Sequence, residues 1–426
     1  MTSMKTLNVL LTASILFAGT LFATDRKELF KVPDFKELPP QTKVMWEKTI
    51  DGVVIQELQF QGASFAGSPT TIYGWYARPQ APGKYPGVVN LHGAGLVAQL
   101  GNKGPVFYAK NGFACLSIDW AGPRDWAGKH EARTIPCSEF DNPGIMAEKG
   151  HIFGSEVDTI TNGVRFVERA FMFLRSRPEV DSSNLFLSGA SAGAHLSLLV
   201  LGVDRGIKGA AVKYGCGYIR DFPTYFGGYF GPLTQVPKDE QDTWLAALDP
   251  KHGIPDFKAN VLMLSGTNDI FFAMPLVLET YRQIPSGKNL LMLPNDNHSQ
   301  VANDEIPLRF FQSCMGTQPA LPAIQSPTAK QEGEALGLQV KITAPSPLSK
   351  VEFWFKRMPS KAFFHGGGEK WQSVAAEEKD GVWCAAVPAV GPDEQLVAYA
   401  TAEDQTGAKA SSDTVEVPDF PKWRGK

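Results

Sequence analysis

The chain has 426 residues, which is enough for one large α/β domain and a smaller second one. Its formal net charge is only −3, so neither nucleic acid nor a negatively charged membrane surface is an expected partner. The 41 glycines and 31 prolines indicate many tight turns in a folded chain.

The first residues predict a secretory signal peptide over residues 1–23. Lys5 precedes a hydrophobic run over residues 7–22, and small Ala23 is followed by polar residues. A basic start, a short hydrophobic segment and a small residue at its end are the parts of such a peptide. We therefore expect a secreted or periplasmic protein without an integral membrane segment after cleavage. The alternative is an uncleaved membrane anchor.

Residues 24–318 are predicted to form the first domain. Residues 24–50 are a charged lead-in that we expect to lie across its surface. Two strand-like runs, residues 53–60 and 71–77, favour an antiparallel hairpin at the edge of a sheet. Strand and helix patterns then alternate, which is typical of a parallel sheet. The predicted strands are residues 87–91, 113–119, 184–187, 209–214, 261–265 and 289–293, and the predicted helices are residues 106–110, 156–175 and 196–201.

Residues 216–255 lie between two of these strands and lack strong periodicity. They are rich in aromatic residues interleaved with Gly and Pro, and aromatic rings offer a wide apolar contact area. The pattern favours a lid over an active site, and the alternative is a surface excursion that packs its own rings. The candidate substrate-binding residues are Tyr218, Tyr225, Phe226, Tyr229 and Trp244.

The pattern changes near residues 318–322, where Pro319 and Pro322 resemble a linker. Residues 325–426 show short alternating runs between turn signals, which predicts a β-sandwich. The predicted strands are residues 338–344, 350–356, 382–387, 395–402 and 413–417. We expect this module to fold separately and to serve docking or substrate presentation. The alternative is a buttress that covers apolar surface on the first domain.

The five cysteines are widely scattered and form neither a disulfide framework nor a metal-binding spacing. No metal and no cofactor are therefore expected. Cys115 lies in an apolar run and is predicted to be buried in the core. An oxidising compartment would allow one disulfide among the five, and the sequence does not identify its two cysteines.

Ser191 carries the strongest chemical signal, in the motif G-x-S-x-G between an apolar strand and a helix. This arrangement lifts a nucleophilic serine above the carboxyl edge of a parallel sheet. Gly189 and Gly193 flank it because side chains there would collide with the neighbouring strand or helix. Ala192 begins the helix, so its backbone N–H can bind a developing oxyanion. The alternative is an ordinary helix capped by Ser and Gly.

A nucleophilic serine needs a base and an acid that orients this base. Asp269 follows the predicted strand 261–265, and His298 follows the strand 289–293. The order Ser, Asp, His is that of enzymes with this elbow. His298 would move the serine proton, and Asp269 would hold its tautomer. The reserve acids are Asp119, Asp296 and Glu305.

A second oxyanion donor is expected in residues 91–95, where small residues let backbone N–H groups approach an ester carbonyl. The N–H of Ala94 is the first candidate, and that of Gly95 is the alternative. One such donor contributes about 10²–10³ in rate. His92 is expected to be structural.

These motifs resemble the dienelactone hydrolase, acetyl xylan esterase and prolyl-oligopeptidase-like branch of the α/β-hydrolases. The matching motifs are residues 91–93, 177–181, 189–193 and 266–269, over roughly residues 50–315. The resemblance implies an α/β-hydrolase fold, with a mostly parallel sheet flanked by helices and an aromatic-rich lid insertion. Residues 396–407 resemble a hairpin of immunoglobulin-like modules, which adds a small all-β sandwich domain. Acyl-ester hydrolysis is the implied reaction, and acetylated carbohydrate is implied by the resemblance alone.

Three functions follow as hypotheses. The first is a secreted or periplasmic serine esterase that acts on esterified carbohydrate or a small-molecule ester. The second is a serine peptidase of prolyl-oligopeptidase-like type, using the same three residues. The third is a non-catalytic surface-binding protein. The ordered Ser, Asp and His argue against the third, because adhesion requires none of them.

Overall fold

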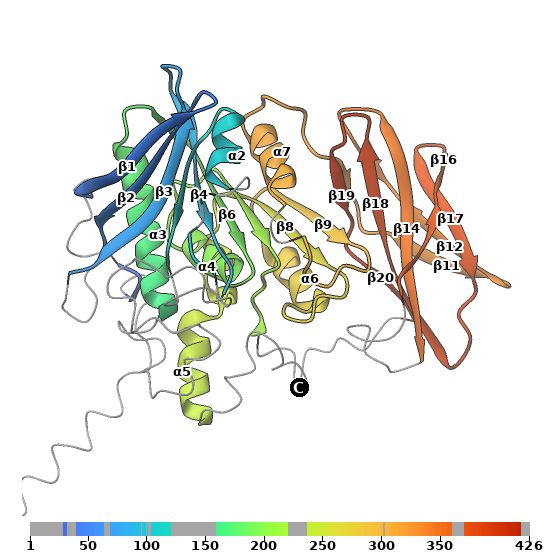
Figure 1. Ribbon diagram of the computed structural model, residues 1–426. Helices are drawn as coiled ribbons and strands as arrows, with labels where there is room; N and C mark the ends of the chain where they lie inside the picture. The colour runs from blue at the N-terminus through green and yellow to red at the C-terminus, as the bar shows by residue number, and fades with distance from the viewer. Residues whose placement is uncertain are drawn as a thin grey trace, which may run out of the picture.

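The computed structural model describes residues 29–31, 40–63, 69–94, 96–98, 100, 104–120, 159–219, 237–300, 303–359 and 370–418. Residues 1–23, the predicted signal peptide, lie outside these ranges. Within them, no helix has the length and hydrophobicity needed to cross a membrane. Figure 1 shows an α/β part and an all-β part side by side.

A nine-stranded sheet forms the centre of the α/β part. From β3 outward to β1 the strands pair antiparallel, β3 pairs antiparallel with β5, and the six strands from β5 to β9 pair parallel. In spatial order the strands are β1 (Thr42–Ile50), β2 (Val53–Gln61), β3 (Thr71–Pro79), β5 (Ala114–Ile118), β4 (Tyr85–Leu91), β6 (Val180–Ala190), β7 (Gly209–Lys213), β8 (Asn260–Gly266) and β9 (Lys288–Leu293). The predicted alternation and the mostly parallel sheet are confirmed.

The antiparallel edge corrects one prediction. The hairpin of β2 and β3 is present, but it is not the edge, because residues 42–50 form the further strand β1. All nine residues of β1 are exposed, so its sequence carries no pattern of buried and exposed positions. The remaining signal was the Asp51-Gly52 pair, whose φ angles of 49° and 75° form a two-residue hairpin turn.

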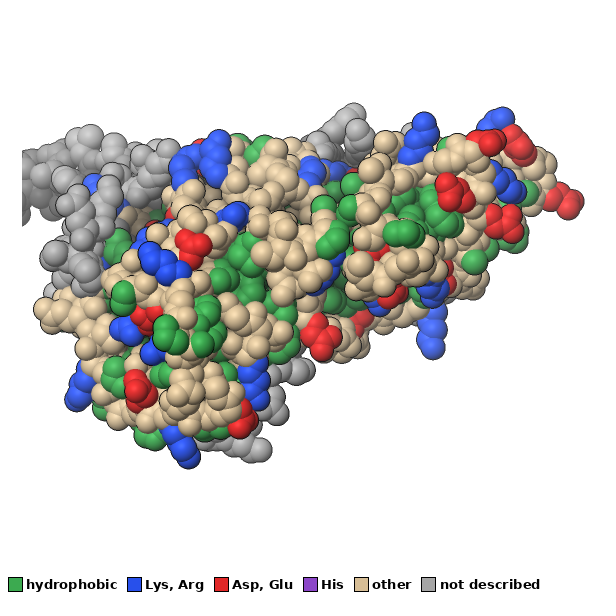
Figure 2. Space-filling view, turned by 90° about the horizontal axis from the view of Figure 1, so that it is seen from above, with side chains coloured by type: hydrophobic (Ala, Val, Ile, Leu, Met, Phe, Trp, Pro, Cys, Tyr) green, Lys and Arg blue, Asp and Glu red, His purple; other side chains and the backbone are tan. Residues whose placement is uncertain are grey.

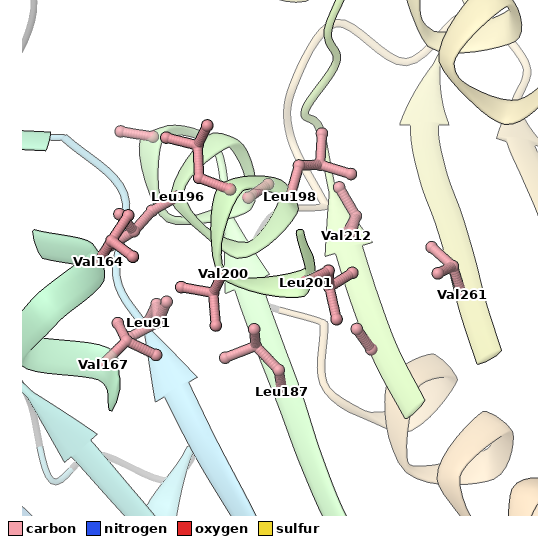
Figure 3. Close-up of a cluster of buried hydrophobic side chains, with 14 of the residues drawn as sticks. Leu91, Val164, Val167, Leu187, Leu196, Leu198, Val200, Leu201, Val212 and Val261 are labelled. Carbon is pink, nitrogen blue, oxygen red and sulfur yellow. The ribbon is translucent and has the colours of Figure 1, made fainter. Parts of the chain in front are cut away.

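Helices cover both faces of this sheet. The helices α3 (Thr159–Ser176), α4 (Ala192–Leu201) and α6 (Met274–Gln283) pack on one face, and α2 (Pro105–Lys110) and α7 (Glu305–Cys314) pack on the other. Successive strand residues point to opposite faces, so Val88 packs with α2 and α7 whereas Val89 packs with α3 and α4. Figure 3 shows side chains of α3, α4 and the adjacent strands gathered in one cluster. Cys115 is fully buried, as predicted, and the four described cysteines are free thiols.

The predicted lid region is only partly described, because residues 220–236 lie outside the described ranges. The described remainder contains the helix α5 (Lys238–Leu248) and two short 3₁₀ turns, Pro250–His252 and Ile254–Asp256. The sequence pattern predicted no helix in residues 216–255, so α5 was missed. This helix is polar in its first half and buries Trp244, Leu245 and Leu248 near its end, so it offers less than two turns of apolar pattern.

The all-β part is a sandwich, as predicted. One sheet has the order β11 (Thr328–Glu332), β12 (Ala335–Val340), β17 (Val382–Pro388) and β16 (Glu377–Lys379). The other has β15 (Gln372–Ala375), β14 (Leu348–Pro359), β18 (Glu394–Asp404) and β19 (Lys409–Ser411), and β20 (Val415–Val417) also pairs with β18. The short β10 (Ala323–Ile324) pairs with β13 (Ile342–Thr343). Leu338 of the first sheet and Phe353 and Leu396 of the second belong to the core between them.

The two parts share a hydrophobic core. Trp371, Val397 and Tyr399 of the sandwich are buried in the same cluster as α3, α4 and α6. Arg282 of α6 forms a bidentate ion pair with Asp413, at 2.7 and 2.8 Å. Strand β19 lies beside β9, the last strand of the central sheet (Figure 1). Acidic and basic side chains are interspersed over both parts on the face shown in Figure 2.

Candidate active site

Ser191 lies between the end of β6 and the start of α4. Its φ of 58° and ψ of −120° are unusual for a residue with a side chain, and such strained conformations concentrate at functional sites. Its backbone N–H donates to Lys213 O at 2.8 Å, which ties the turn to β7. Ser191 holds the N-cap position of α4, yet its side chain makes no capping hydrogen bond. This geometry is that of a nucleophile elbow and differs from that of an ordinary capping serine.

The glycines around Ser191 are explained by close contacts. A Cβ added to Gly189 would lie 2.7 Å from the carbonyl carbon of Gly193, inside α4. A Cβ on Gly193 would lie 2.5 Å from His92 O and 2.9 Å from Leu91 O, at the end of β4. Real side chains do not tolerate such distances, so the predicted collisions with strand and helix are confirmed.

His298 and Asp269 meet at the carboxyl ends of β8 and β9. Nδ1 of His298 lies 2.8 Å from Oδ2 of Asp269, whose side chain is fully buried. Because a carboxylate only accepts, Nδ1 carries the proton and Nε2 is the nitrogen that can take another. The other oxygen, Oδ1, accepts the backbone N–H groups of Phe271 and Phe272 at 2.7 and 3.0 Å. Asp269 is thus held rigidly with one oxygen aimed at the imidazole.

The loops that carry these two residues are joined directly. The N–H of Asn268 donates to Asp296 O at 3.0 Å, and the N–H of Thr267 donates to Leu293 O at 3.0 Å. Gly266 permits this approach, because a Cβ there would lie 2.8 Å from the carbonyl carbon of Asp296. The motif at residues 266–269 therefore joins this loop to the loop that carries His298, and it also contains Asp269.

The three reserve acids make other contacts. Asp119 accepts the backbone N–H of Ala98 at 2.5 Å, and Glu305 begins α7. Asp296 accepts the hydroxyls of Tyr214 and Ser299 and the backbone N–H of His298, so it supports the loop rather than the imidazole. Burial alone would raise the pKa of Asp296, but these hydrogen bonds lower it. Its carboxylate is therefore an acceptor at neutral pH.

The two sides of the expected oxyanion hole adjoin each other. Ala192 is the first residue of α4, so its N–H is among the amides that a helix leaves without an intrahelical partner. Gly93, which precedes Ala94, packs against Ser191, because a Cβ there would lie 3.2 Å from Ser191 Cβ. Gly95, the alternative donor, lies outside the described residues.

His92 is held by contacts with Trp120. Its carbonyl accepts the indole N–H of Trp120 at 2.9 Å, and the two rings stack with centroids 5.5 Å apart. Burial lowers the pKa of His92 to about 4, so the ring is neutral at physiological pH. The expected structural role agrees with these contacts.

Three aromatic rings that the sequence analysis did not single out surround His298. The ring centroids of Tyr214, Phe271 and Phe272 lie 4.7, 4.9 and 6.2 Å from that of the imidazole. Tyr214 directly follows β7, and its hydroxyl donates to Asp296. The sequence offered one indication of their role: Tyr214 directly follows a strand, and Phe271 and Phe272 closely follow Asp269. Only the fold shows that they converge on one histidine.

Of the five candidate substrate-binding residues, Tyr225, Phe226 and Tyr229 lie outside the described residues. Tyr218 is half-buried, and its N–H donates to the buried Asp249 at 2.9 Å. Trp244 is 4% exposed and stacks on His195, with ring centroids 6.0 Å apart. In this structure Trp244 therefore contributes to packing of α5 against α4.

Comparisons with known proteins give consistent matches. A family model described as acetyl xylan esterase (AXE1) matches residues 31–310, which end before the predicted sandwich domain. The chain is 26% identical over 238 residues to acetyl esterase Axe7A of Xylanibacter ruminicola, covering 54% of this chain and 52% of that protein. The chain thus spans about half the length of this curated relative.

Two solved structures resemble about two thirds of this chain. Acetyl xylan esterase 1 from Thermoanaerobacterium sp. JW/SL YS485 has a TM-score of 0.56 and 18% identity, over 68% of this chain and 94% of that one. The acetyl xylan esterase from Paenibacillus sp. R4 has a TM-score of 0.52 and 20% identity, over 64% and 88%. At these identities the likeness establishes the α/β-hydrolase fold.

Proposed function

This chain belongs to the acetyl xylan esterase (AXE1) family, and from that premise we propose that it hydrolyses carboxylic esters, with acetylated carbohydrate as the substrate class. The observation that carries the proposal is the 2.8 Å contact between His298 Nδ1 and Asp269, at the same sheet edge as the elbow of Ser191. A serine nucleophile, a histidine base and an acid that orients the histidine are the groups with which serine hydrolases cleave esters without a metal.

The proposed reaction has two halves. Nε2 of His298 takes the proton of the Ser191 hydroxyl while Oγ attacks the ester carbonyl carbon, and a tetrahedral oxyanion forms. His298 then gives the proton to the leaving alcohol as the carbon–oxygen ester bond breaks, which leaves an acyl group on Ser191. A water molecule attacks this acyl-enzyme in the same manner and releases the carboxylic acid and free Ser191.

The surroundings of His298 support this proton transfer. The imidazole becomes a cation in each half-reaction, and the buried Asp269 stabilises it while keeping Nε2 as the exchanging nitrogen. Backbone N–H groups of Ala192 and Ala94 are the proposed donors to the oxyanion. We further propose that Tyr218, Tyr225, Phe226 and Tyr229 contact the substrate, and that residues 1–23 direct export of the protein.

Three substrates and one inhibitor test this proposal. The full-length protein is assayed with p-nitrophenyl acetate and with a peptide anilide, each with and without a serine-directed fluorophosphonate, and then with acetylated xylan. We expect fluorophosphonate-sensitive hydrolysis of the acetyl esters and release of acetate from the polymer. Faster cleavage of the peptide anilide than of the acetyl esters would favour the serine peptidase over the esterase. Absence of hydrolysis and of fluorophosphonate labelling would reject both and leave the non-catalytic binding protein.

A further inference from the structure

The loop that carries His298 has an unusual backbone. Within residues 294–299, Asn295 has a φ of 60° and His298 a φ of 98°, a region that side-chain-bearing residues rarely adopt. Such a backbone conformation is strained and persists only where neighbouring contacts hold it. Asp296 supplies part of the support through Tyr214 and Ser299.

Asn295 supplies support from a different part of the chain. Its side-chain Nδ2 donates to Trp371 O at 3.0 Å, and the N–H of Trp371 donates back to Asn295 Oδ1 at 2.8 Å. This reciprocal pair also fixes the orientation of the amide, because the flipped side chain could make neither bond. The backbone N–H of Asn295 donates to Thr267 Oγ1 at 2.8 Å, on the loop that carries Asp269. Asn295 thus joins the histidine loop, the acid loop and the sandwich.

The sandwich is a firm attachment point. Trp371 is 3% exposed and packs edge-on against Tyr399 of β18, with ring centroids 5.2 Å apart. In addition, Ser411 Oγ of β19 accepts the N–H of Met292 at 2.9 Å. Met292 belongs to β9, the strand that leads into the histidine loop. The sandwich therefore contacts both the strand and the loop that place His298.

We propose that the C-terminal sandwich takes part in forming the active site, with Asn295 as the positioning residue that transmits its support to His298. The inference rests on the proposed esterase function, in which His298 is the base, and it assigns a role to a module beyond the family match at residues 31–310. Asn295 itself is exposed, so it adds little to the buried core. Its contribution is directional hydrogen bonding rather than burial.

Asn295→Gly is the decisive variant in the full-length protein. Glycine adopts the positive φ without strain, so the variant removes the two side-chain bonds and leaves the backbone conformation accessible. Asn295→Ala removes the bonds and also adds strain. The matched control is Arg282→Ala, which breaks the bidentate pair with Asp413 and so weakens the same interface away from the histidine loop.

We expect Asn295→Gly to lower kcat for p-nitrophenyl acetate about 10- to 100-fold, the loss that a displaced catalytic group produces, with KM changed less than about twofold. Asn295→Ala should be slower still. Arg282→Ala should lower the melting temperature at least as much but keep kcat within about twofold of the wild type. Equal kcat values in Asn295→Gly and Arg282→Ala would overturn the proposal.

A second readout separates this inference from the proposed function. The proton on His298 Nδ1, which is hydrogen-bonded to Asp269, is observed by NMR as a low-field resonance. The resonance is assigned by its loss in the variant His298→Gln. We expect this resonance to broaden or disappear in Asn295→Gly and to persist in Arg282→Ala, whether or not the wild type hydrolyses esters. An unchanged resonance in Asn295→Gly would overturn the positioning role even in an active enzyme. Absence of hydrolysis in the wild type would instead reject the proposed function.

Discussion

Ser191 is held in a strained conformation and its side chain makes no capping hydrogen bond, which agrees with its proposed role as a nucleophile. We predict that Ser191→Ala lowers kcat for p-nitrophenyl acetate by on the order of 10⁶-fold. The fold should remain, because the side chain makes no capping bond that supports α4. Steady-state kinetics with circular dichroism and melting temperature as controls test this. Activity within tenfold of the wild type would remove Ser191 from the mechanism.

Asp269 and Asp119 both follow strands, but only Asp269 contacts the imidazole. We predict that Asp269→Asn lowers kcat by about 10⁴-fold, because an amide can donate to Nδ1 and so favour the wrong tautomer. Asp119→Asn is the matched control and should change kcat much less, since Asp119 accepts the N–H of Ala98. The kcat values of the two variants are compared at the same fraction of folded protein. A larger loss of kcat in Asp119→Asn than in Asp269→Asn would identify Asp119 as the orienting acid.

At the scale of the element, α3 carries a buried acidic group that makes its stability depend on pH. Oε1 of Glu168 is buried without a hydrogen-bond partner among the described residues, although part of the side chain reaches the surface. Burial, aided by Asp204 and opposed by Arg175, raises the pKa of Glu168 from 4.5 to about 8. In the unfolded chain the group ionises near its ordinary value.

The sign of the effect follows from proton binding. Between about pH 4.5 and 8 the folded state keeps the proton and the unfolded state releases it, so stability falls as the pH rises through this window. We predict that Glu168→Gln removes this dependence and raises the melting temperature at pH 8.5 relative to pH 5.5, compared with the wild type. The control is Glu378→Gln on exposed β16, which changes the net charge equally. The same pH dependence in wild type and Glu168→Gln would contradict the assignment.

At the scale of the whole molecule, the sandwich and the α/β part are joined by a shared core, an ion pair and the pairing of Asn295 with Trp371. Separate folding of residues 325–426 stays a prediction. A protein ending at Gln318 would lose Trp371, Val397 and Tyr399 from the shared core, and each large buried apolar side chain contributes roughly 1.5–3 kcal/mol.

We therefore predict that this truncation lowers the melting temperature or the soluble yield and also lowers kcat for p-nitrophenyl acetate. The reason for the second effect is the loss of support for the His298 loop. Thermal denaturation, soluble yield and turnover are measured beside the full-length protein. A soluble truncated protein with full turnover and weakened binding to acetylated xylan would instead support docking as the role of the sandwich.

The sequence by itself determined the local features. Ser191 and its glycines form a readable motif because Gly189 lies against Gly193 and Gly193 lies against the end of β4, so neither position accepts a side chain. Asp269 and His298 follow strands whose apolar runs are readable. The alternation of strand and helix and the sandwich were predicted from burial, since burial on one face leaves a period in the sequence and burial of a strand on both faces leaves a continuous apolar run. Strand β1 and helix α5 were missed where exposure or a short apolar stretch leaves no such period.

Only the tertiary structure decided which groups meet. The rings around His298 come from three loop positions, and the partner of Asn295 is a backbone segment 76 residues further along the chain. A bond to a backbone N–H and C=O places no demand on the identity of the partner residue, so it leaves no motif to read. The connection between the sandwich and the histidine loop was therefore absent from the sequence pattern, because it depends on how two separately patterned sheets pack together.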